Sequence, residues 1–170
     1  PSSIKSIKSY AFQGCSKLAH ITIPSSVTYI GYEVFAKCSS LKELQIPSSV
    51  TSTKQYLIKD YKSIEQVTIP SSTTFIDDYD YAGFSSLKEV KIPESVTKIG
   101  NNAFYKCSSL EKIAIPSSVK SIGKNTFQGC SKLTEITLSS SLTSLGYYCF
   151  YYCSKLVTIS ISPTSPLNLI

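Results

Sequence analysis

The sequence predicts a solenoid built from short parallel strands, and three observations support this fold class. A proline recurs every 23 residues, at positions 1, 24, 47, 70, 93 and 116. Apolar side chains recur with the same period, so equivalent positions of successive units match. One unit is too small to bury its apolar side, whereas stacked units bury a continuous core. We therefore predict one domain of seven 23-residue repeats over 1–161, followed by a tail at 162–170.

Each unit contains one predicted strand and one predicted turn. The segment from Leu41 to Ile46 has the spacing L-x-x-L-x-L, and its second half alternates between apolar and polar residues. Pro47 ends this strand because proline has no N–H to donate to a neighbouring strand. Ser48 and Ser49 form the turn. The remaining stretch is too short for more than turns or helical turns.

The strand motif and the segment after it closely resemble one known family. L-x-x-L-x-L followed by I-P-S-S-V-x-x-I-G-x-x-x-F-x-x-C-S-x-L resembles the BspA-like class of leucine-rich repeats, over nearly the whole chain. The resemblance implies a leucine-rich-repeat solenoid: a right-handed curved stack with a parallel β-sheet on the concave face and short turns or helical turns on the convex face. Such proteins are typically surface antigens, so it also implies adhesion to host or neighbouring-cell proteins.

Most of the cysteines occupy a predicted core position. One repeat position holds Cys15, Cys38, Cys107, Cys130 and Cys153. Phe84 takes this position in unit four, and a site that required thiols would not accept phenylalanine. The position is therefore predicted as core, with cysteine acting as a small hydrophobic residue. Cys149 lies at another position, without a histidine nearby to complete a zinc site.

The sequence signals no catalytic or cofactor-binding site. His20 is the single histidine, and its repeat position lies on an outward strand face without an activating partner. Neither a phosphate-binding loop nor a dinucleotide fingerprint is present. We predict that the protein is not an enzyme and needs no cofactor or metal.

The outward strand positions form the predicted binding site for a protein partner. Their positive and negative charges nearly cancel, and the chain contains no arginine, which argues against nucleic acid. Solenoids commonly bind other proteins through this face. The predicted protein-binding residues of the concave face are His20, Thr22, Glu43, Gln45, Gln66, Thr68, Glu89, Lys91, Lys112, Glu135 and Thr137.

Units three and four depart from the repeat pattern and suggest a second patch on the convex side. Lys54 and Asp77 replace the usual glycine, and tyrosines cluster with acidic residues. Exposed tyrosine offers the rigid amphipathic surface that interfaces use. Repeat drift explains the same substitutions equally well. The residues of this second patch are Tyr56, Tyr61, Asp77, Asp78, Tyr79 and Tyr81.

Two locations and two roles remain open at this stage. The resemblance favours the cell surface, whereas unpaired cysteines and the absence of N-x-[ST] sites and of a signal pattern favour the cytoplasm. The alternative role is an intracellular scaffold or regulator that binds a cytosolic signalling protein. No transmembrane segment is predicted. The tail is expected to cap the last unit, and an uncovered first unit permits end-to-end association.

Overall fold

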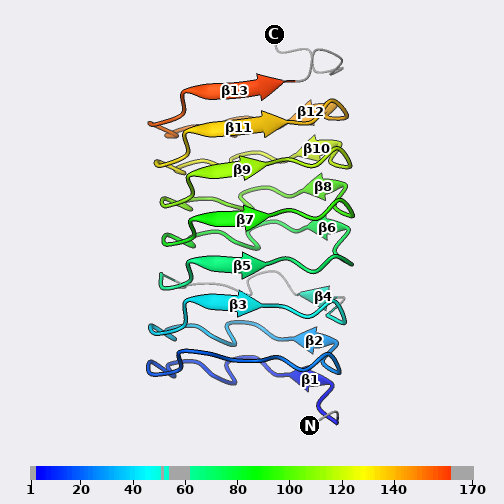
Figure 1. Ribbon diagram of the computed structural model, residues 1–170, viewed down its shortest axis with the longest axis vertical. Coiled ribbons are helices and arrows are strands. Elements are labelled where there is room, and N and C mark those ends of the chain that lie inside the picture. The colour runs from blue at the N-terminus through cyan, green and yellow to red at the C-terminus, as the bar shows by residue number, and fades with distance from the viewer. Residues whose placement is uncertain (1–2, 51, 54–61, 162–170) are drawn as a thin grey trace.

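The chain coils into an elongated, right-handed stack of short strands and turns (Figure 1). A computed structural model describes residues 3–50, 52–53 and 62–161. The chain follows the front strands from left to right, returns behind them, and rises by one unit per turn. The described part contains about six turns of solenoid and no helix. Accordingly, no helix of the described residues is long and apolar enough to cross a membrane.

Six longer strands lie on one side of the stack and form its long-strand face, the side predicted as concave. They are arranged in two three-stranded parallel sheets, β3-β5-β7 and β9-β11-β13. Their bounds are β3 (Glu43–Gln45), β5 (Gln66–Thr68), β7 (Glu89–Lys91), β9 (Lys112–Ala114), β11 (Glu135–Leu138) and β13 (Thr158–Ile161).

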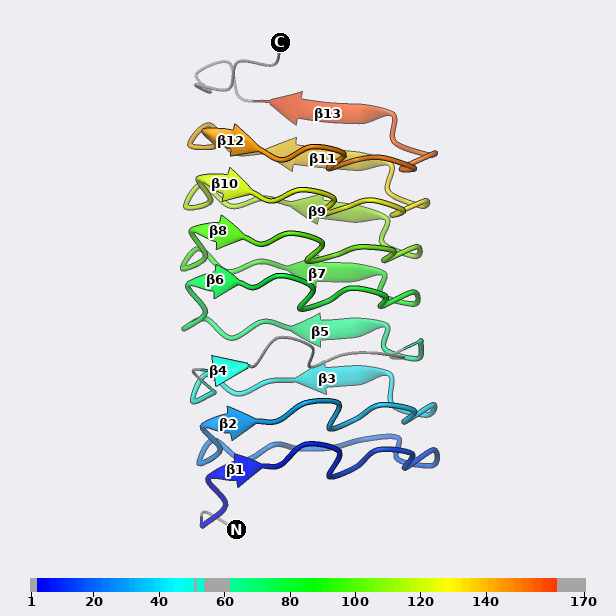
Figure 2. The same ribbon diagram turned by 180° about the vertical axis from the view of Figure 1, so that it is seen from behind.

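Seven two-residue strands lie on the opposite side, where the sequence predicted only turns (Figure 2). They form a three-stranded sheet, β1-β2-β4, and a four-stranded sheet, β6-β8-β10-β12. Their bounds are β1 (Ser6–Ile7), β2 (Tyr29–Ile30), β4 (Ser52–Thr53), β6 (Phe75–Ile76), β8 (Lys98–Ile99), β10 (Ser121–Ile122) and β12 (Ser144–Leu145).

Every paired residue lies 23 positions from its partner, which confirms the predicted register. On the long-strand face Leu44 pairs with Val67, and Val67 pairs with Val90. On the opposite side Ile99 pairs with Ile122. Because all pairs are parallel and share one offset, equivalent side chains lie directly above one another.

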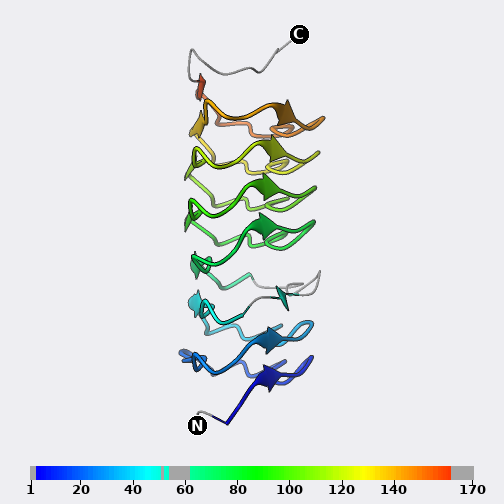
Figure 3. The ribbon, with the colours of Figure 1, turned by 90° about the vertical axis from the view of Figure 1, so that its right-hand side faces the viewer.

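The core lies between the two sets of strands, which Figure 3 shows on opposite sides of the stack. Leu41 and Leu110 are fully buried in one cluster, and Leu18 of the end unit packs against it. Phenylalanine rings stack through the centre: the ring centroids of Phe104 and Phe127 are 5.6 Å apart with an interplanar angle of 6°. Offset stacking of this kind adds stability beyond the buried area.

The turns opposite the long strands are not helical, and backbone conformation explains why. The segment that follows β8 in unit five, for example, contains two residues in the left-handed conformation, Asn102 (φ 56°) and Lys106 (φ 57°). Left-handed residues cannot continue a right-handed helix. The segment instead bonds to the unit above, as where the Phe104 N–H donates to the carbonyl of Thr126 at 2.9 Å.

Candidate protein-binding face

The long-strand face is polar because only alternate residues of each strand point into the core. In β3, β5, β7 and β9 the central residue is buried and the two flanking residues are exposed. Side chains at successive strand positions point to opposite faces of a sheet, so the exposed ones from all units share one surface. Parallel stacking therefore makes one continuous polar surface along the solenoid.

The structure places all eleven predicted face residues in exposed positions, and nine of them lie on the long strands. His20 and Thr22 are the exceptions, because their segment belongs to no strand. The prediction that His20 occupies a strand position is therefore wrong.

An open hollow of about 490 Å³ lies in this face, over β7, β9 and β11. Lys91, Ala114 and Thr137 occupy one outward repeat position in successive units, and all three line the hollow. Ala114 is the smallest of them, so it leaves a depression between its neighbours. The sequence shows this alanine, but the size of the hollow follows only from the packed structure.

The hollow also lies where the sheet of the long strands is interrupted. The successive strands β7 and β9 belong to separate sheets. Glu94 and Pro116, which follow these strands, complete the lining. The sequence analysis did not include these two residues, because strand alternation gives no signal about side chains beyond the strand end.

Charges alternate along the floor of the hollow. Glu89, Lys112 and Glu135 occupy the same outward position in successive units and all line the hollow. Among the described residues, ion pairs occur only at Glu65, away from this hollow. The three charged groups are thus available to a partner with a matching pattern, and such complementarity favours specificity.

Of the residues predicted to form the second patch, the structure leaves only Asp77 and Tyr79 exposed among those it describes. Tyr81 is 6% exposed and stacks on Phe104 in the core, so including it in a surface patch was wrong. Its repeat position is the aromatic core position. Asp77 and Tyr79 are exposed. Asp78 is half-buried and accepts a hydrogen bond from the Asn101 N–H at 2.7 Å. Tyr56 and Tyr61 lie outside the described residues.

Four of the five cysteines at the predicted core position are buried, and Cys15, at the exposed end, is the exception. Cys149, which lies at another repeat position, is buried as well. The Cys107 thiol donates to the carbonyl of Tyr81 at 3.1 Å, and the Cys153 thiol donates to that of Phe127 at 3.1 Å. Burial raises the pKa of Cys149 to about 12 and that of Cys153 to about 11. Such thiols stay protonated at neutral pH and are poor nucleophiles.

The described residues contain no cluster of histidine, cysteine and acidic residues that fits a metal ion. His20 is solvent-exposed. The strands of the long-strand face are held in place by main-chain pairing and core packing.

The fold and its surface define a leucine-rich-repeat solenoid, a class known for protein interaction and typically a non-catalytic binding scaffold. The model of the BspA type leucine rich repeat region matches residues 1–107 and 59–167, with six copies. The chain belongs to this family. The division into seven units over 1–161 stays a prediction.

Solved bacterial structures share the fold. A leucine-rich repeat protein from Bacteroides ovatus is 28% identical, with a TM-score of 0.76 over 94% of this chain and 47% of that protein. A leucine rich cell surface protein from Faecalibacterium prausnitzii is 22% identical, with a TM-score of 0.69 over 100% of this chain and 56% of the other. The pneumococcal vaccine antigen PcpA is 21% identical, with a TM-score of 0.52 over 96% and 61% of the two chains.

The last two likenesses concern the fold alone. The chain spans about half the length of the first two proteins. None of the curated proteins matches this chain.

Proposed function

We propose that this solenoid is a protein-binding module of surface-antigen type, which adheres to host or neighbouring-cell proteins through its long-strand face. The observation that carries the proposal is the continuous exposed surface of strand residues with an open hollow of about 490 Å³ between β7 and β11. A preformed surface binds without a large ordering cost.

The chemistry of the hollow suits a folded or extended protein segment. Buried Ile113 and the small Ala114 give its lining an apolar part, while Glu89, Lys112 and Glu135 surround it with both signs of charge. Interfaces combine an apolar centre with a polar rim in this way. The cell-surface description of the Faecalibacterium protein and the vaccine-antigen description of PcpA support the surface-antigen role by analogy.

Free cysteines no longer favour the alternative role of an intracellular scaffold. Five of the six cysteines are buried. Burial shields a thiol from oxidants and disfavours its thiolate, so reduced cysteines persist in either compartment. Adhesion outside the cell therefore remains compatible with unpaired thiols.

The test compares two triple variants that add the same charge to opposite sides of the solenoid. Ala114→Lys and Thr137→Lys fill the hollow, and with Thr68→Lys they add three charges to the long-strand face. Thr74→Lys, Thr97→Lys and Thr143→Lys add three charges at exposed positions beside the short strands, where Lys120 is the native equivalent. The measurement is binding of the labelled protein to intact epithelial cells, before and after mild trypsin treatment of the cells.

We expect trypsin to remove most wild-type binding, the long-strand variant to bind at least about tenfold more weakly, and the matched variant to bind like the wild type. Equal binding by both variants would place the interface elsewhere. Binding that survives trypsin would contradict a protein partner.

A further inference from the structure

The net positive charge of the chain is concentrated along one edge of the solenoid. This edge, the pre-strand edge, comprises the six-residue segments that lead into the long strands: 14–19, 37–42, 60–65, 83–88, 106–111, 129–134 and 152–157. These segments hold eight of the 17 lysines and three of the 11 acidic residues, and thus five of the six net charges. The rest of the chain is nearly neutral.

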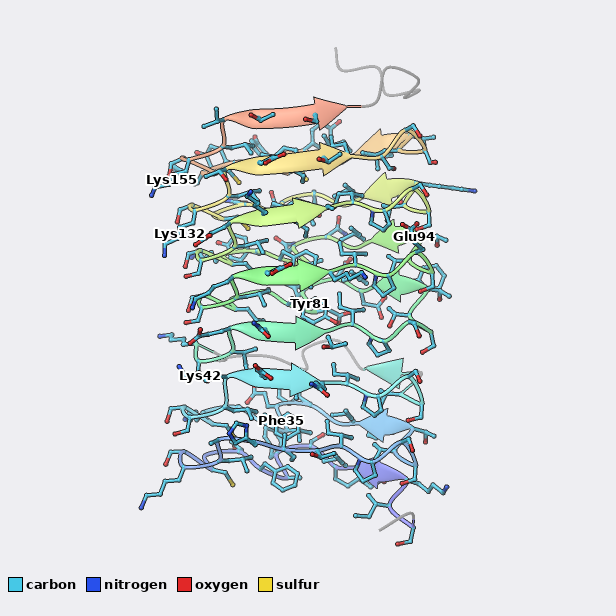
Figure 4. All side chains as sticks on the ribbon, viewed as in Figure 1. Phe35, Lys42, Tyr81, Glu94, Lys132 and Lys155 are labelled. Carbon is cyan, nitrogen blue, oxygen red and sulfur yellow. The ribbon has the colours of Figure 1, made fainter. Side chains whose placement is uncertain are left out.

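The described residues of these segments lie above one another, at the left of the view in Figure 4. Lys42, Lys132 and Lys155 are labelled there, on the side opposite Glu94. Main-chain hydrogen bonds join the segments: the Glu65 N–H donates to the Lys42 carbonyl at 2.8 Å, and the Val157 N–H donates to the Thr134 carbonyl at 3.0 Å. Successive segments therefore lie about 4.8 Å apart along the stack. The lysines occupy four different repeat positions and are thus spread along this edge.

Among the described residues, two of the eight lysines of the edge form ion pairs, both with Glu65. Glu65 pairs with Lys88 at 2.6 Å and with Lys42 at 3.4 Å. Hydrogen bonding to Lys88, and then to Lys42, lowers the pKa of Glu65. Within the described ranges, no acidic group lies within 4.0 Å of the Lys132 or Lys155 ammonium. All eight lysines of the edge are exposed.

An open hollow of about 480 Å³ lies on the same edge, lined by Lys37, Ser39, Lys42, Lys62 and Ser63. The two serine hydroxyls donate their protons within the protein: Ser39 to the Ser16 carbonyl at 3.3 Å, and Ser63 to the Cys38 carbonyl at 3.0 Å. Each serine oxygen is left with the capacity to accept a hydrogen bond. The hollow thus offers ammonium donors beside hydroxyl acceptors.

This combination selects one class of ligand. Centres of protein interfaces are poor in lysine and depend on aromatic or arginine anchors, and Tyr152 is the one exposed aromatic residue of the described edge. Nucleic-acid sites use arginine and stacked aromatic rings, and the chain has no arginine. A polysaccharide with acidic groups has anions for the lysine ammonium groups of this edge and hydroxyl protons for the serine oxygens.

We propose that the pre-strand edge binds a linear acidic polysaccharide laid along the solenoid axis, at a site separate from the long-strand face. The lysine ammonium groups bind its sulfate or carboxylate groups, and the oxygens of Ser39 and Ser63 accept hydrogen bonds from its hydroxyls. The interaction is electrostatic and hence weakens as salt concentration rises.

The experiment measures binding of the full chain to four probes in solution: dextran sulfate, polygalacturonate, neutral dextran and single-stranded DNA. The edge variant combines Lys62→Gln, Lys132→Gln and Lys155→Gln. The matched variant combines Lys98→Gln, Lys120→Gln and Lys124→Gln, which removes three exposed charges from the opposite side. Thermal unfolding verifies that both variants are folded.

We expect the edge variant to lose about tenfold or more in affinity for the acidic polysaccharides, and the matched variant to lose less than about threefold. Binding to either acidic polymer supports the proposal, and the tighter of the two identifies sulfate or carboxylate as the preferred group. Equal losses for the two variants would show attraction by net charge alone and overturn it. Tighter binding to DNA, or equal binding to neutral dextran, would overturn it as well.

Discussion

The upper units of the solenoid repeat regularly, whereas the junction between units three and four does not. The strands β6, β8, β10 and β12 form one continuous sheet, while β4 and β6 are successive but unpaired. The serine hydroxyls of the turns show the same change. Ser95 and Ser118 donate to carbonyls 22 residues back, and Ser72 donates to Ser48, 24 residues back. The regular offset is lost at this junction.

One glycine position explains much of this difference. A Cβ atom added to Gly123 would lie 2.6 Å from the backbone nitrogen of Asn101 in the unit beneath. The backbones of successive units are therefore so close here that no side chain fits. Lys54 and Asp77 occupy this position in units three and four. A side chain at this point is incompatible with the close approach found elsewhere.

The junction also contains a buried carboxyl group. Asp80 is 6% exposed, and its equivalents in other units include the buried Val34 and Ala103. Its Oδ2 accepts the Asp77 N–H at 2.8 Å, whereas its buried Oδ1 has no hydrogen-bond partner among the described residues. A hollow of about 330 Å³ lies beside it. The irregularity is nevertheless confined to one side, because β5 and β7 remain paired across the junction.

The largest effect is expected where the stack is most regular. Phe104→Ala removes a fully buried ring that lies between Tyr81 and Phe127. We expect a loss of about 3–5 kcal/mol in the free energy of unfolding, measured in urea, because truncation leaves a cavity in a packed core. Phe12→Ala in the end unit, where the ring is partly exposed, should cost less. A negligible loss for Phe104→Ala would contradict the stacked core.

A smaller loss is expected from crowding the glycine position. Gly123→Ala places a methyl group against the backbone of the unit beneath, which must shift, at a cost of about 1–3 kcal/mol. Lys8→Ala is the matched control, because Lys8 holds the same repeat position in unit one, with no unit of this sequence beneath it. That control should stay within about 0.5 kcal/mol of the wild type. A tolerated Gly123→Ala would show that close approach does not explain the junction.

The smallest effect is a gain, and it depends on pH. Burial, reinforced by the charges of Asp77 and Asp78, raises the pKa of Asp80 to about 7 from an ordinary value of 3.8. Between these values the folded chain binds the proton that the unfolded chain has lost. Proton binding by Asp80 therefore stabilises the folded chain at pH values below the ordinary pKa of this group, and the stabilisation is lost as pH rises towards 7.

Asp80→Ala should remove this pH dependence and raise the free energy of unfolding at pH 8 by about 1 kcal/mol, because an unpaired buried oxygen is deleted. Urea unfolding of both proteins at pH 4, 6 and 8 measures the difference. Glu135→Gln, at an exposed carboxylate, should leave the profile unchanged. A wild-type profile that is flat between pH 4 and 8 would contradict the assignment to Asp80.

The sequence alone determined the register, the core positions and the outward residues of the long strands. The 23-residue period identifies which side chains lie above one another, and alternation identifies which of them point outward, as at Leu44 and its exposed neighbours Glu43 and Gln45. Both are local properties of the chain. They do not depend on the detailed approach of one unit to the next.

Only the tertiary structure decided the second sheet, the break between β7 and β9, and the position of the hollow around Ala114. It also places Tyr81 in the core instead of at the surface, and it places lysines of separate units along one edge. These features depend on how closely neighbouring backbones approach and on the relative sizes of stacked side chains. Such distances are set by packing between units, which a pattern within one unit does not encode.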